Sequence, residues 1–383
     1  MEIVVLVLFL VLPIIVFTPL LSRKLKLPVI IIEMIIGIIL GKSFLNIIPF
    51  ENSIIEFFSA FGLIYLMFLG GLKTNLNSIT TSLSISLPIV LASVFFPFFF
   101  GLFLSLFIPI HPLLAGVIFS TTSLGLILPL VKEVNYKKEF FNIVLVSVML
   151  VDIISVFLLS FSLAFIKKLI SFSFIYSLIL IVSLFLLPQL IRKNYVLSGI
   201  RNLLTKKSYF ETEIRLAFAL IVILSVISEN LGFHSILGAF IAGLIIAEIT
   251  PKIFLFEKKL ESFGYGFFIP LFFIFEGGKI NLWVLISKLE NLKNLIVIVF
   301  GGLFSKFLGV ALVSKIKGFN LKESLALGSF HMSRLSLIVG ITKIAREMKL
   351  ISEALSSSFM ILAITSAVFG PFLGKFFLNI KKS

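Results

Sequence analysis

The sequence is poor in the residues on which many enzyme sites depend. Its 383 residues include no cysteine, a single aspartate (Asp152), three histidines and one tryptophan, and 13% of the residues are charged. Without cysteine there can be no disulfide framework and no thiol chemistry. The histidines follow no metal-ligand spacing, so we expect neither a metal site nor a resident cofactor.

Apolar residues, by contrast, make up 59% of the chain, which contains 46 phenylalanines and has a mean hydropathy of +1.20. A soluble protein of this size could not bury that much apolar surface, so we expect a lipid bilayer around it. The net charge of +15 would suggest a nucleic-acid partner for a soluble protein. Here the basic residues lie in short connections between apolar segments, which is typical of membrane proteins.

Hydropathy and loop residues predict an all-α polytopic protein with about thirteen transmembrane helices. The first span has no basic segment before it and no small-residue cleavage site, so we expect a retained helix instead of a signal peptide. We expect one membrane domain over residues 1–383 without a soluble regulatory domain. The predicted spans are 3–21, 28–45, 54–72, 84–108, 112–131, 142–165, 173–191, 214–230, 234–250, 263–277, 293–314, 322–345 and 354–378.

The basic residues are distributed unequally between the two sets of connections. The odd-numbered connections and the C-terminal end hold 22 of the 33 Lys and Arg residues, the other connections hold nine, and Lys306 and Arg334 lie within spans. Cytoplasmic loops carry the excess of Lys and Arg. We therefore expect the N-terminus outside and the C-terminus in the cytoplasm, most simply in a prokaryotic inner membrane.

Sequence patterns recur about 206 residues apart. The run LPVIIIEMIIGIILG around Gly37 is similar to HSILGAFIAGLIIAE around Gly243, and FLGGLKTNL from Phe68 is similar to FEGGKINL from Phe275. The fifth and twelfth spans form a third pair. The offset of seven spans is odd, so the second copy crosses in the opposite sense, as in the inverted repeats of secondary transporters. We expect repeats at about 28–165 and 234–378, joined by a linking helix at 173–191.

Asp152 lies near the middle of the sixth predicted span. A carboxylate at bilayer depth costs at least about 2.5 kcal/mol and is a functional-site hypothesis by default. The eleventh span carries Lys306 at a similar depth, where an ammonium needs a counter-charge or must lose its proton. Because Asp152 is the only aspartate, we expect Lys306 to be its charge partner. Snorkelling of Lys306 to an interface is the alternative.

Two spans have polar centres. In the fifth span, Thr121, Thr122 and Ser123 follow Ser120 and could offer hydroxyls and freed carbonyls to a cation, although such residues can also bond only their own helix. The twelfth span carries four polar residues in its centre, His331, Ser333, Arg334 and Ser336. Arg334 must face a cavity or a carboxylate, and Glu33 and Glu276 are possible ion-pair partners.

Enzyme functions fit the sequence badly. An intramembrane aspartyl protease needs two aspartates that share a proton, and the chain has one. The sequence contains no G-x-S-x-G, H-E-x-x-H or Walker glycine loop. Transport is the function class that remains.

The order of motifs resembles the monovalent cation–proton antiporter superfamily, in the branch with a lysine in the eleventh span. The resemblance rests on LKLPVIIIEMIIGIILG, GLIYLMFLGGLKTNL, FSTTSLGLILPLVKE, VDIIS, HSILGAFIAGLIIAE, FFIPLFFIFEGGKINL, SKFLG and MSRLSLIVG, and it covers nearly the whole chain. It implies thirteen spans, a homodimer with a dimerisation domain, and a core domain in which two broken helices cross beside the aspartate.

Carried onto this sequence, the resemblance implies that Asp152 binds the cation or proton and that Lys306 pairs with it. Thr122 and Ser123 would belong to the first broken helix and Arg334 to the second. Two positions depart from the family pattern. Val151 stands where an amide or carboxylate side chain is usual before the aspartate, and Leu335 and Ser336 stand where Gly-Glu is usual after the arginine.

The sequence therefore predicts a secondary antiporter that exchanges Na⁺, K⁺ or Li⁺ for H⁺ by alternating access at Asp152. Its partners would be the bilayer, the monovalent cation, the proton and a second copy of the chain, and no nucleic acid. Two alternatives stay open at this point. One is a sodium-coupled symporter of an organic anion, in which Arg334 and Lys306 would serve the anion. The other is a degenerate antiporter that acts as a membrane sensor or partner subunit.

Overall fold

The computed structural model describes residues 2–25, 27–50, 52–73, 76–124, 126–127, 136–166, 211–231, 233–249 and 253–378. The regular secondary structure in this part of the chain is all helical, and no strand is present in it. Seven of its helical segments are long and apolar enough to cross a membrane, and α2 and α11 are shorter apolar helices. The all-α membrane architecture is confirmed. The count of thirteen stays a prediction, because the predicted seventh span, 173–191, lies outside the described residues.

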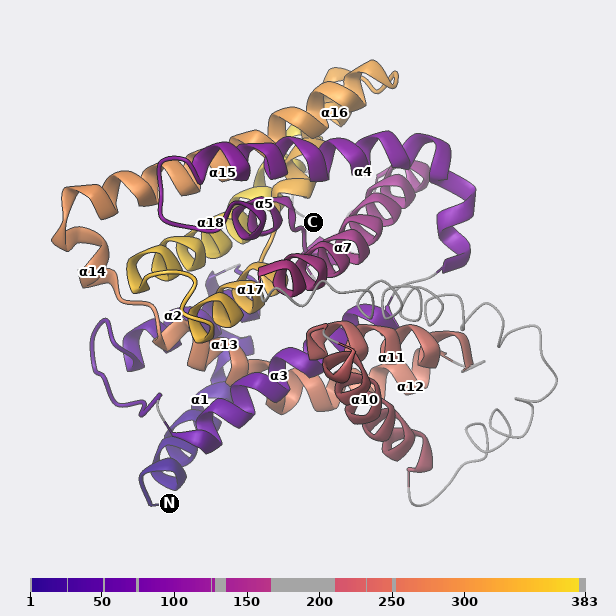
Figure 1. Cartoon of the computed structure of the whole chain (residues 1–383). Helices are drawn as coiled ribbons and strands as arrows, with labels where there is room; N and C mark the ends of the chain where they lie inside the picture. Colours follow the sequence, from indigo (N-terminus) through magenta and orange to yellow (C-terminus); the bar gives the residue numbers. More distant parts are fainter. Residues whose placement is uncertain are drawn as a thin grey trace. The chain divides into compact units, whose positions relative to one another are not determined.

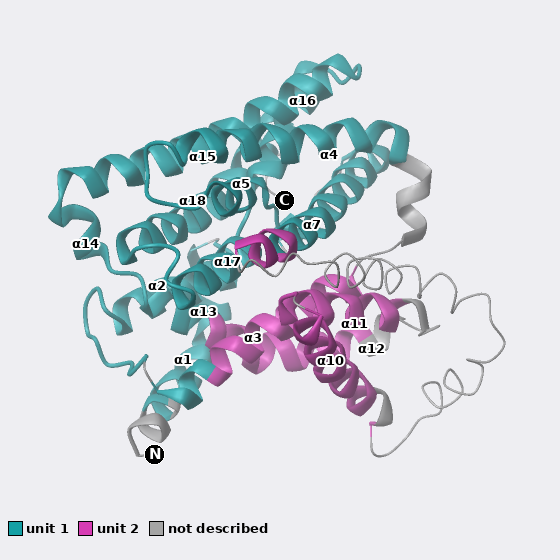
Figure 2. Ribbon diagram, in the orientation of Figure 1, with its two compact units in different colours: residues 1–56, 77–159, 273–383 teal, residues 57–76, 160–272 magenta. Residues whose placement is uncertain are grey.

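The chain forms two compact units, each built from both halves of the sequence (Figure 2). Unit 1 comprises residues 1–56, 77–159 and 273–383, and unit 2 comprises residues 57–76 and 160–272. Unit 2 contains most of α3 (Ser53–Leu72) together with α10 (Thr212–Asn230), α11 (Ser235–Ile249), α12 (Ile253–Phe263) and the π-helix η2 (Gly264–Phe268).

Unit 1 holds every residue that the sequence marks as a candidate for ion binding or charge pairing. Its helices, labelled in Figure 1, are α1 (Glu2–Leu25), α2 (Val29–Leu40), α4 (Leu76–Leu104), α5 (Pro112–Ser120), most of α7 (Lys138–Ile166), α13 (Ile269–Gly278), α14 (Leu282–Ser287), α15 (Leu289–Ile316), α16 (Leu321–Met332), α17 (Ser336–Glu347) and α18 (Glu353–Phe377).

Glycines allow two helix pairs to approach closely, and the contacts repeat along the sequence. In unit 1, a Cβ added to Gly37 of α2 would lie closer than 3.0 Å to the carbonyl oxygen of Ile274 in α13. In unit 2, a Cβ added to Gly243 of α11 would lie equally close to the carbonyl oxygen of Phe68 in α3. Both members of the second pair are related to the first by the offset of 206. The internal repeat in the sequence is therefore also a repeat of backbone contacts.

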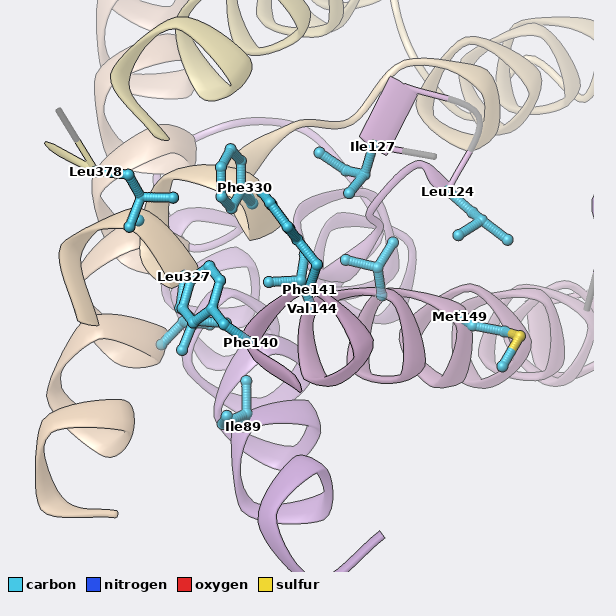
Figure 3. Packing of buried hydrophobic residues seen from close by; sticks show 13 residues of the cluster. Ile89, Leu124, Ile127, Phe140, Phe141, Val144, Met149, Leu327, Phe330 and Leu378 are labelled. Carbon is cyan, nitrogen blue, oxygen red and sulfur yellow. The ribbon is translucent and has the colours of Figure 1, made fainter. Parts of the chain in front are cut away.

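An apolar cluster fixes α7 within unit 1 (Figure 3). Phe140, Phe141 and Val144 of α7 pack with Leu327 and Phe330 of α16. The cluster also includes residues from the segment after α5, Leu124 and Ile127, together with Ile89 of α4. Burial of these side chains places the helix that carries Asp152 against both interrupted spans.

Both predicted interruptions are present in the backbone. After α5 ends at Ser120, residues 121–123 are not helical, and residues 333–335 separate α16 from α17. The two interruptions meet, because the amide of Ser123 donates to the carbonyl of Ser333 at 3.0 Å. Their hydroxyl groups also meet, since Ser123 Oγ and Ser336 Oγ are 3.4 Å apart. The fifth and twelfth spans are thus broken helices that touch at their breaks.

Candidate functional site at the broken helices

Asp152 lies on α7 beside the first interruption. Its Oδ2 accepts a hydrogen bond of 3.0 Å from the amide of Leu124, the residue at which helical backbone resumes. The residue is partly exposed, yet its Oδ1 is buried and accepts no hydrogen bond from the residues that the structure describes. The carboxylate therefore has one oxygen fixed by the backbone and one available for a further ligand.

Lys306 lies on α15 at the other end of the same interruption. The side chain is fully buried, and its ammonium group donates to the carbonyl of Ser120 and, at 2.6 Å, to that of Thr121. The last carbonyls of a helix have no partner within the helix and carry partial negative charge. The lysine supplies the donors and the positive charge that the end of α5 requires.

The two charges thus complement opposite ends of one break. Asp152 bonds an amide freed at the start of a helical turn, whereas Lys306 bonds carbonyls freed at the end of α5. Asp152 and Lys306 do not form an ion pair within 4.0 Å, and both side chains instead contact the backbone of residues 120–124. The expected direct pair is absent in this conformation, because backbone groups freed by the break take its place.

Arg334 stabilises the same region from the second break. The residue is fully buried, and its Nη1 donates to the carbonyl of Phe119 at 2.6 Å while Nη2 donates to that of Gly302 at 2.5 Å. Its backbone is held by α18, since Ser366 Oγ donates to the Arg334 carbonyl at 2.6 Å. The guanidinium therefore connects α5 and α15 through their backbone carbonyls, whereas the backbone of Arg334 is anchored to α18.

This arrangement corrects the expected carboxylate partners of Arg334. Glu276 of α13 instead binds Lys279 at 2.6 Å and Arg346 at 3.1 Å, and its side chain is fully buried. Glu33 of α2 is also buried and forms no ion pair with Arg334. The sequence could not show this, because carbonyl groups freed by a broken helix can satisfy an arginine as well as a carboxylate can.

The remaining predicted site residues line the two breaks. Thr121, Thr122, Ser123, His331 and Ser333 are all buried. The hydroxyl of Thr121 donates to Ile118 O at 3.0 Å, and His331 Nδ1 lies 2.9 Å from Leu327 O. In contrast, Thr122 Oγ1, Ser333 Oγ and His331 Nε2 have no hydrogen-bond partner among the described residues. Thr122 and Asp152 therefore each bring an unoccupied oxygen to the region of the first break.

Sequence reasoning missed two serines near the site. Ser366 anchors the backbone of Arg334, and Ser155 lies three residues after Asp152, on the same face of α7. The Ser155 hydroxyl is buried and has no hydrogen-bond partner in the described part of the chain. Ser366 is one small polar residue among many in an apolar span, so no spacing in the sequence distinguishes it. Ser155 could have been found from its helical spacing to Asp152.

The two departures from the expected family pattern have structural roles. Val151 is buried and packs with Val90 and Val94 of α4, so this position serves the apolar core. Ser336 contacts Ser123 across the crossing of the two breaks. Hydroxyl groups and backbone bonds thus hold the crossing point without a carboxylate at either position.

Comparison with known proteins identifies the family of the chain. The family model described as sodium/hydrogen exchanger, transmembrane, matches residues 9–379. The chain belongs to this family. A putative Na⁺/H⁺ antiporter, YjbQ of Bacillus subtilis (strain 168), is 30% identical over 381 residues, which cover 92% of this chain and 60% of that protein. This chain thus spans less than two thirds of the length of that relative.

Two proteins of Methanocaldococcus jannaschii match along nearly their full length. The probable Na⁺/H⁺ antiporter 3 of Methanocaldococcus jannaschii is 28% identical, with coverage of 96% of this chain and 95% of that protein. The solved structure of the sodium proton antiporter MjNhaP1 from the same organism, at pH 8, matches with a TM-score of 0.69. It covers 98% of both chains at 18% identity, which establishes a common fold. The sodium/hydrogen exchanger family therefore accounts for the fold of the whole chain.

Proposed function

We propose that this member of the sodium/hydrogen exchanger family is a secondary antiporter that exchanges a monovalent cation, Na⁺, K⁺ or Li⁺, for H⁺. The observation that carries the proposal is Asp152, whose carboxylate lies beside a broken helix with one oxygen held by the Leu124 amide and the other unoccupied. The names of the related proteins, several of them Na⁺/H⁺ antiporters, support the same reaction.

The cation site would include the carboxylate of Asp152 and the first break. Small cations prefer oxygen ligands, and carboxylate, hydroxyl and backbone carbonyl groups supply them in transporters with broken helices. Thr122 offers a buried hydroxyl that has no partner among the described residues, and the backbone of residues 121–123 is not helical. Thr121 and Ser123 would contribute carbonyl or hydroxyl oxygens to the dehydrated ion.

Competition at a single carboxylate couples the two fluxes. The ionised carboxylate holds the cation, and protonation removes the charge that binds it, so the cation leaves. The protonated or cation-loaded site is neutral and can be exposed to the other side of the membrane, whereas an empty ionised carboxylate is costly at bilayer depth. The site therefore changes the side of the membrane to which it is exposed only when a proton or a cation is bound.

Lys306 and Arg334 fix the shape of the site in this mechanism. Both bind backbone carbonyls at the end of α5 or on α15, and both contribute positive charge near the break. Their charge compensates the helix end and disfavours a second cation. Lys306 would act as a charge partner of Asp152 through the field across the break.

Four further features belong to the proposal. The antiporter would be a homodimer in a prokaryotic inner membrane, with its N-terminus outside and its C-terminus in the cytoplasm. The excess of basic residues in the odd-numbered connections supports this orientation.

Asp152→Asn tests the reaction. The purified full chain is reconstituted into liposomes with an imposed pH gradient, and collapse of the gradient is followed with a pH-sensitive dye after addition of Na⁺, K⁺ or Li⁺. We expect the wild-type protein to collapse the gradient and Asp152→Asn to fall to the level of empty liposomes. The amide keeps an acceptor for Leu124 but cannot ionise. Glu139→Gln, an exposed carboxylate in the first turn of the same helix, is the matched control.

Three results would contradict the proposal. Exchange by Asp152→Asn at near-wild-type rate would make the carboxylate structural. Sodium-driven uptake of an organic anion without proton movement would indicate a symporter. A folded wild-type protein that collapses no gradient with any of the three cations would indicate a sensor or partner subunit.

A further inference from the structure

A second charged site lies in unit 1, around a cavity of about 540 Å³ next to the C-terminal ends of α2, α13 and α17. The ends of α2 and α13 are joined, because the amide of Lys42 donates to the carbonyl of Gly278 at 2.9 Å. Three basic side chains, Lys42, Lys279 and Arg346, and two acidic ones, Glu56 and Glu347, line the cavity. Its other lining residues are Asn46, Ile47, Ile48, Pro49 and Phe50.

Some of the basic side chains that line the cavity have a structural role. Lys279 and Arg346 neutralise the buried carboxylate of Glu276, at 2.6 and 3.1 Å. Basic residues are also favourable at the C-terminal ends of helices. Lys343, which is nearly fully buried, binds Glu347. These pairs explain why basic residues gather here, but they leave much of the hydrogen-bonding capacity of the lining unused.

Basic and acidic side chains of the lining both have hydrogen-bonding or ion-pairing capacity that these contacts leave unused. An arginine has five donors and a lysine three, and the bonds that Arg346 and Lys279 make to Glu276 use one of each. Lys42 pairs with Glu353 at 3.0 Å, but both side chains are about 40% exposed, and such pairs contribute little stability. Glu56 is exposed and forms no ion pair with any residue that the structure describes.

The charges of the lining and of its direct partners cancel. There are four basic side chains, Lys42, Lys279, Lys343 and Arg346, and four acidic ones, Glu56, Glu276, Glu347 and Glu353. A site without net charge does not concentrate simple anions or cations over a distance. A ligand that carries both signs can nevertheless use the basic side chains and Glu56 at the same time.

Aromatic residues indicate the depth of the cavity in the membrane. The indole of Trp283, the single tryptophan of the chain, donates to the carbonyl of Ser43 at 2.5 Å, directly after Lys42. Its side chain is 58% exposed and lies edge-on to the exposed Phe44, with 6.5 Å between the ring centroids. Exposed tryptophan is enriched at the level of lipid headgroups. The cavity therefore lies where a phosphate-bearing headgroup can reach it.

We propose that this cavity binds a zwitterionic phosphoamine, with the phosphate on Lys42, Lys279 and Arg346 and the ammonium group on Glu56. The same chemistry occurs in a free phosphoamine and in the headgroup of an aminophospholipid. The site is separate from the broken helices, and it connects the end of α17, which follows the second break, with the ends of α2 and α13.

The test compares two soluble probes on the detergent-purified, delipidated full chain, by calorimetric titration. Glycerophosphoethanolamine carries a phosphodiester and an amine, and glycerophosphoglycerol carries the same phosphodiester with hydroxyl groups and no amine. We expect the wild-type protein to bind the first probe more tightly, by up to about fivefold, since an ion pair with an exposed carboxylate contributes at most about 1 kcal/mol. Lys42→Gln should weaken both probes, whereas Glu56→Gln should weaken only the amine-bearing probe, until the two bind equally.

Lys349→Gln is the matched control, because this exposed lysine follows α17 but does not line the cavity. Lys42 and Glu56 are chosen over Arg346 because neither neutralises Glu276, so both variants should fold. Equal binding of the two probes by the wild-type protein would overturn the proposal. Loss of affinity in Lys349→Gln to the same extent as in Lys42→Gln would also overturn it, because the effect would then be one of overall charge.

A second arm separates the two sources of the ligand. Thermal stability is measured in nanodiscs of phosphatidylglycerol with and without added phosphatidylethanolamine, for the wild-type protein and for Glu56→Gln. A rise with phosphatidylethanolamine that Glu56→Gln abolishes indicates the lipid headgroup, and a rise only with the soluble probe indicates a free phosphoamine. No response to either source would contradict the site. None of these measurements depends on transport, so failure of this proposal can be distinguished from failure of the proposed antiport function.

Discussion

Replacement of Lys306 by methionine separates two roles for this residue. In the structure the ammonium binds the carbonyls of Ser120 and Thr121, and it does not contact Asp152 directly. Methionine preserves most of the side-chain length but supplies no donor, so both carbonyls lose a charge-assisted hydrogen bond. Such bonds contribute about 1.5–3 kcal/mol each. Removing a buried charge recovers about 2.5–3.5 kcal/mol, so the mid-range values leave a net loss of about 1.5 kcal/mol.

The assay is thermal unfolding of the purified protein, in the wild-type and Asp152→Asn backgrounds. If Lys306 serves the end of α5, Lys306→Met should lower the free energy of unfolding by a similar amount in both backgrounds, and Lys306→Arg should restore most of it. Lys315→Met, an exposed position on the same helix, should change stability by less than about 0.5 kcal/mol. Exchange should fall in Lys306→Met, because the end of α5 no longer has a fixed position.

A direct ion pair would give a different result. Breaking a buried pair costs about 3–5 kcal/mol because one charge is left uncompensated. Lys306→Met would then be strongly destabilising on its own, and Asp152→Asn would rescue it. Such a rescue would refute the reasoning from the carbonyl contacts and would restore the pairing that the sequence suggested.

Three further predictions follow from particular contacts. Thr122→Val removes a buried hydroxyl without a partner among the described residues and should raise the apparent KM for the cation. Thr121→Val removes a hydroxyl that already binds its own helix and should raise the KM less. Equal effects of the two variants in the exchange assay would show that the Thr122 hydroxyl does not bind the cation. Gly37→Ala should destabilise the protein by more than about 1 kcal/mol, because the added Cβ would clash with α13. Gly266→Ala is the control and should not lower the melting temperature, because a Cβ on Gly266 meets nothing within 4 Å. A stable Gly37→Ala protein would mean that α2 and α13 are not in close contact. Glu276→Gln should lower the free energy of unfolding by about 3–5 kcal/mol, because two basic side chains lose their buried acidic partner. A free energy of unfolding within about 1 kcal/mol of the wild-type value would show that water already screens this cluster.

The sequence by itself determined the class of fold and the position of the chemistry. Thirteen apolar segments and the charge bias required a polytopic membrane protein, because only lipid can accommodate so much apolar surface. Asp152 could be singled out because an ionisable residue at bilayer depth is costly and the chain contains no second aspartate. The two breaks were also predictable, since polar residues and glycine weaken a helix locally.

The partners of the buried charges were decided only by the tertiary structure. The sequence predicts Asp152 as the charge partner of Lys306, and either a cavity or a carboxylate such as Glu33 or Glu276 beside Arg334. In the folded chain both cations bind backbone carbonyls instead. A sequence shows which side chains can carry charge, but it does not show which backbone groups a broken helix leaves free.

The same limit applies to the cavity beside α2, α13 and α17. Lys42, Lys279 and Arg346 lie in three different connections, and in the sequence they are only exceptions to the positive-inside bias. Close approach of α2 and α13 at their glycines brings the helix ends together, and Glu276 then draws Lys279 and Arg346 into one cluster. Periodicity and composition specify each helix separately, whereas contacts between distant helices depend on how their surfaces fit, and only the folded chain contains that information.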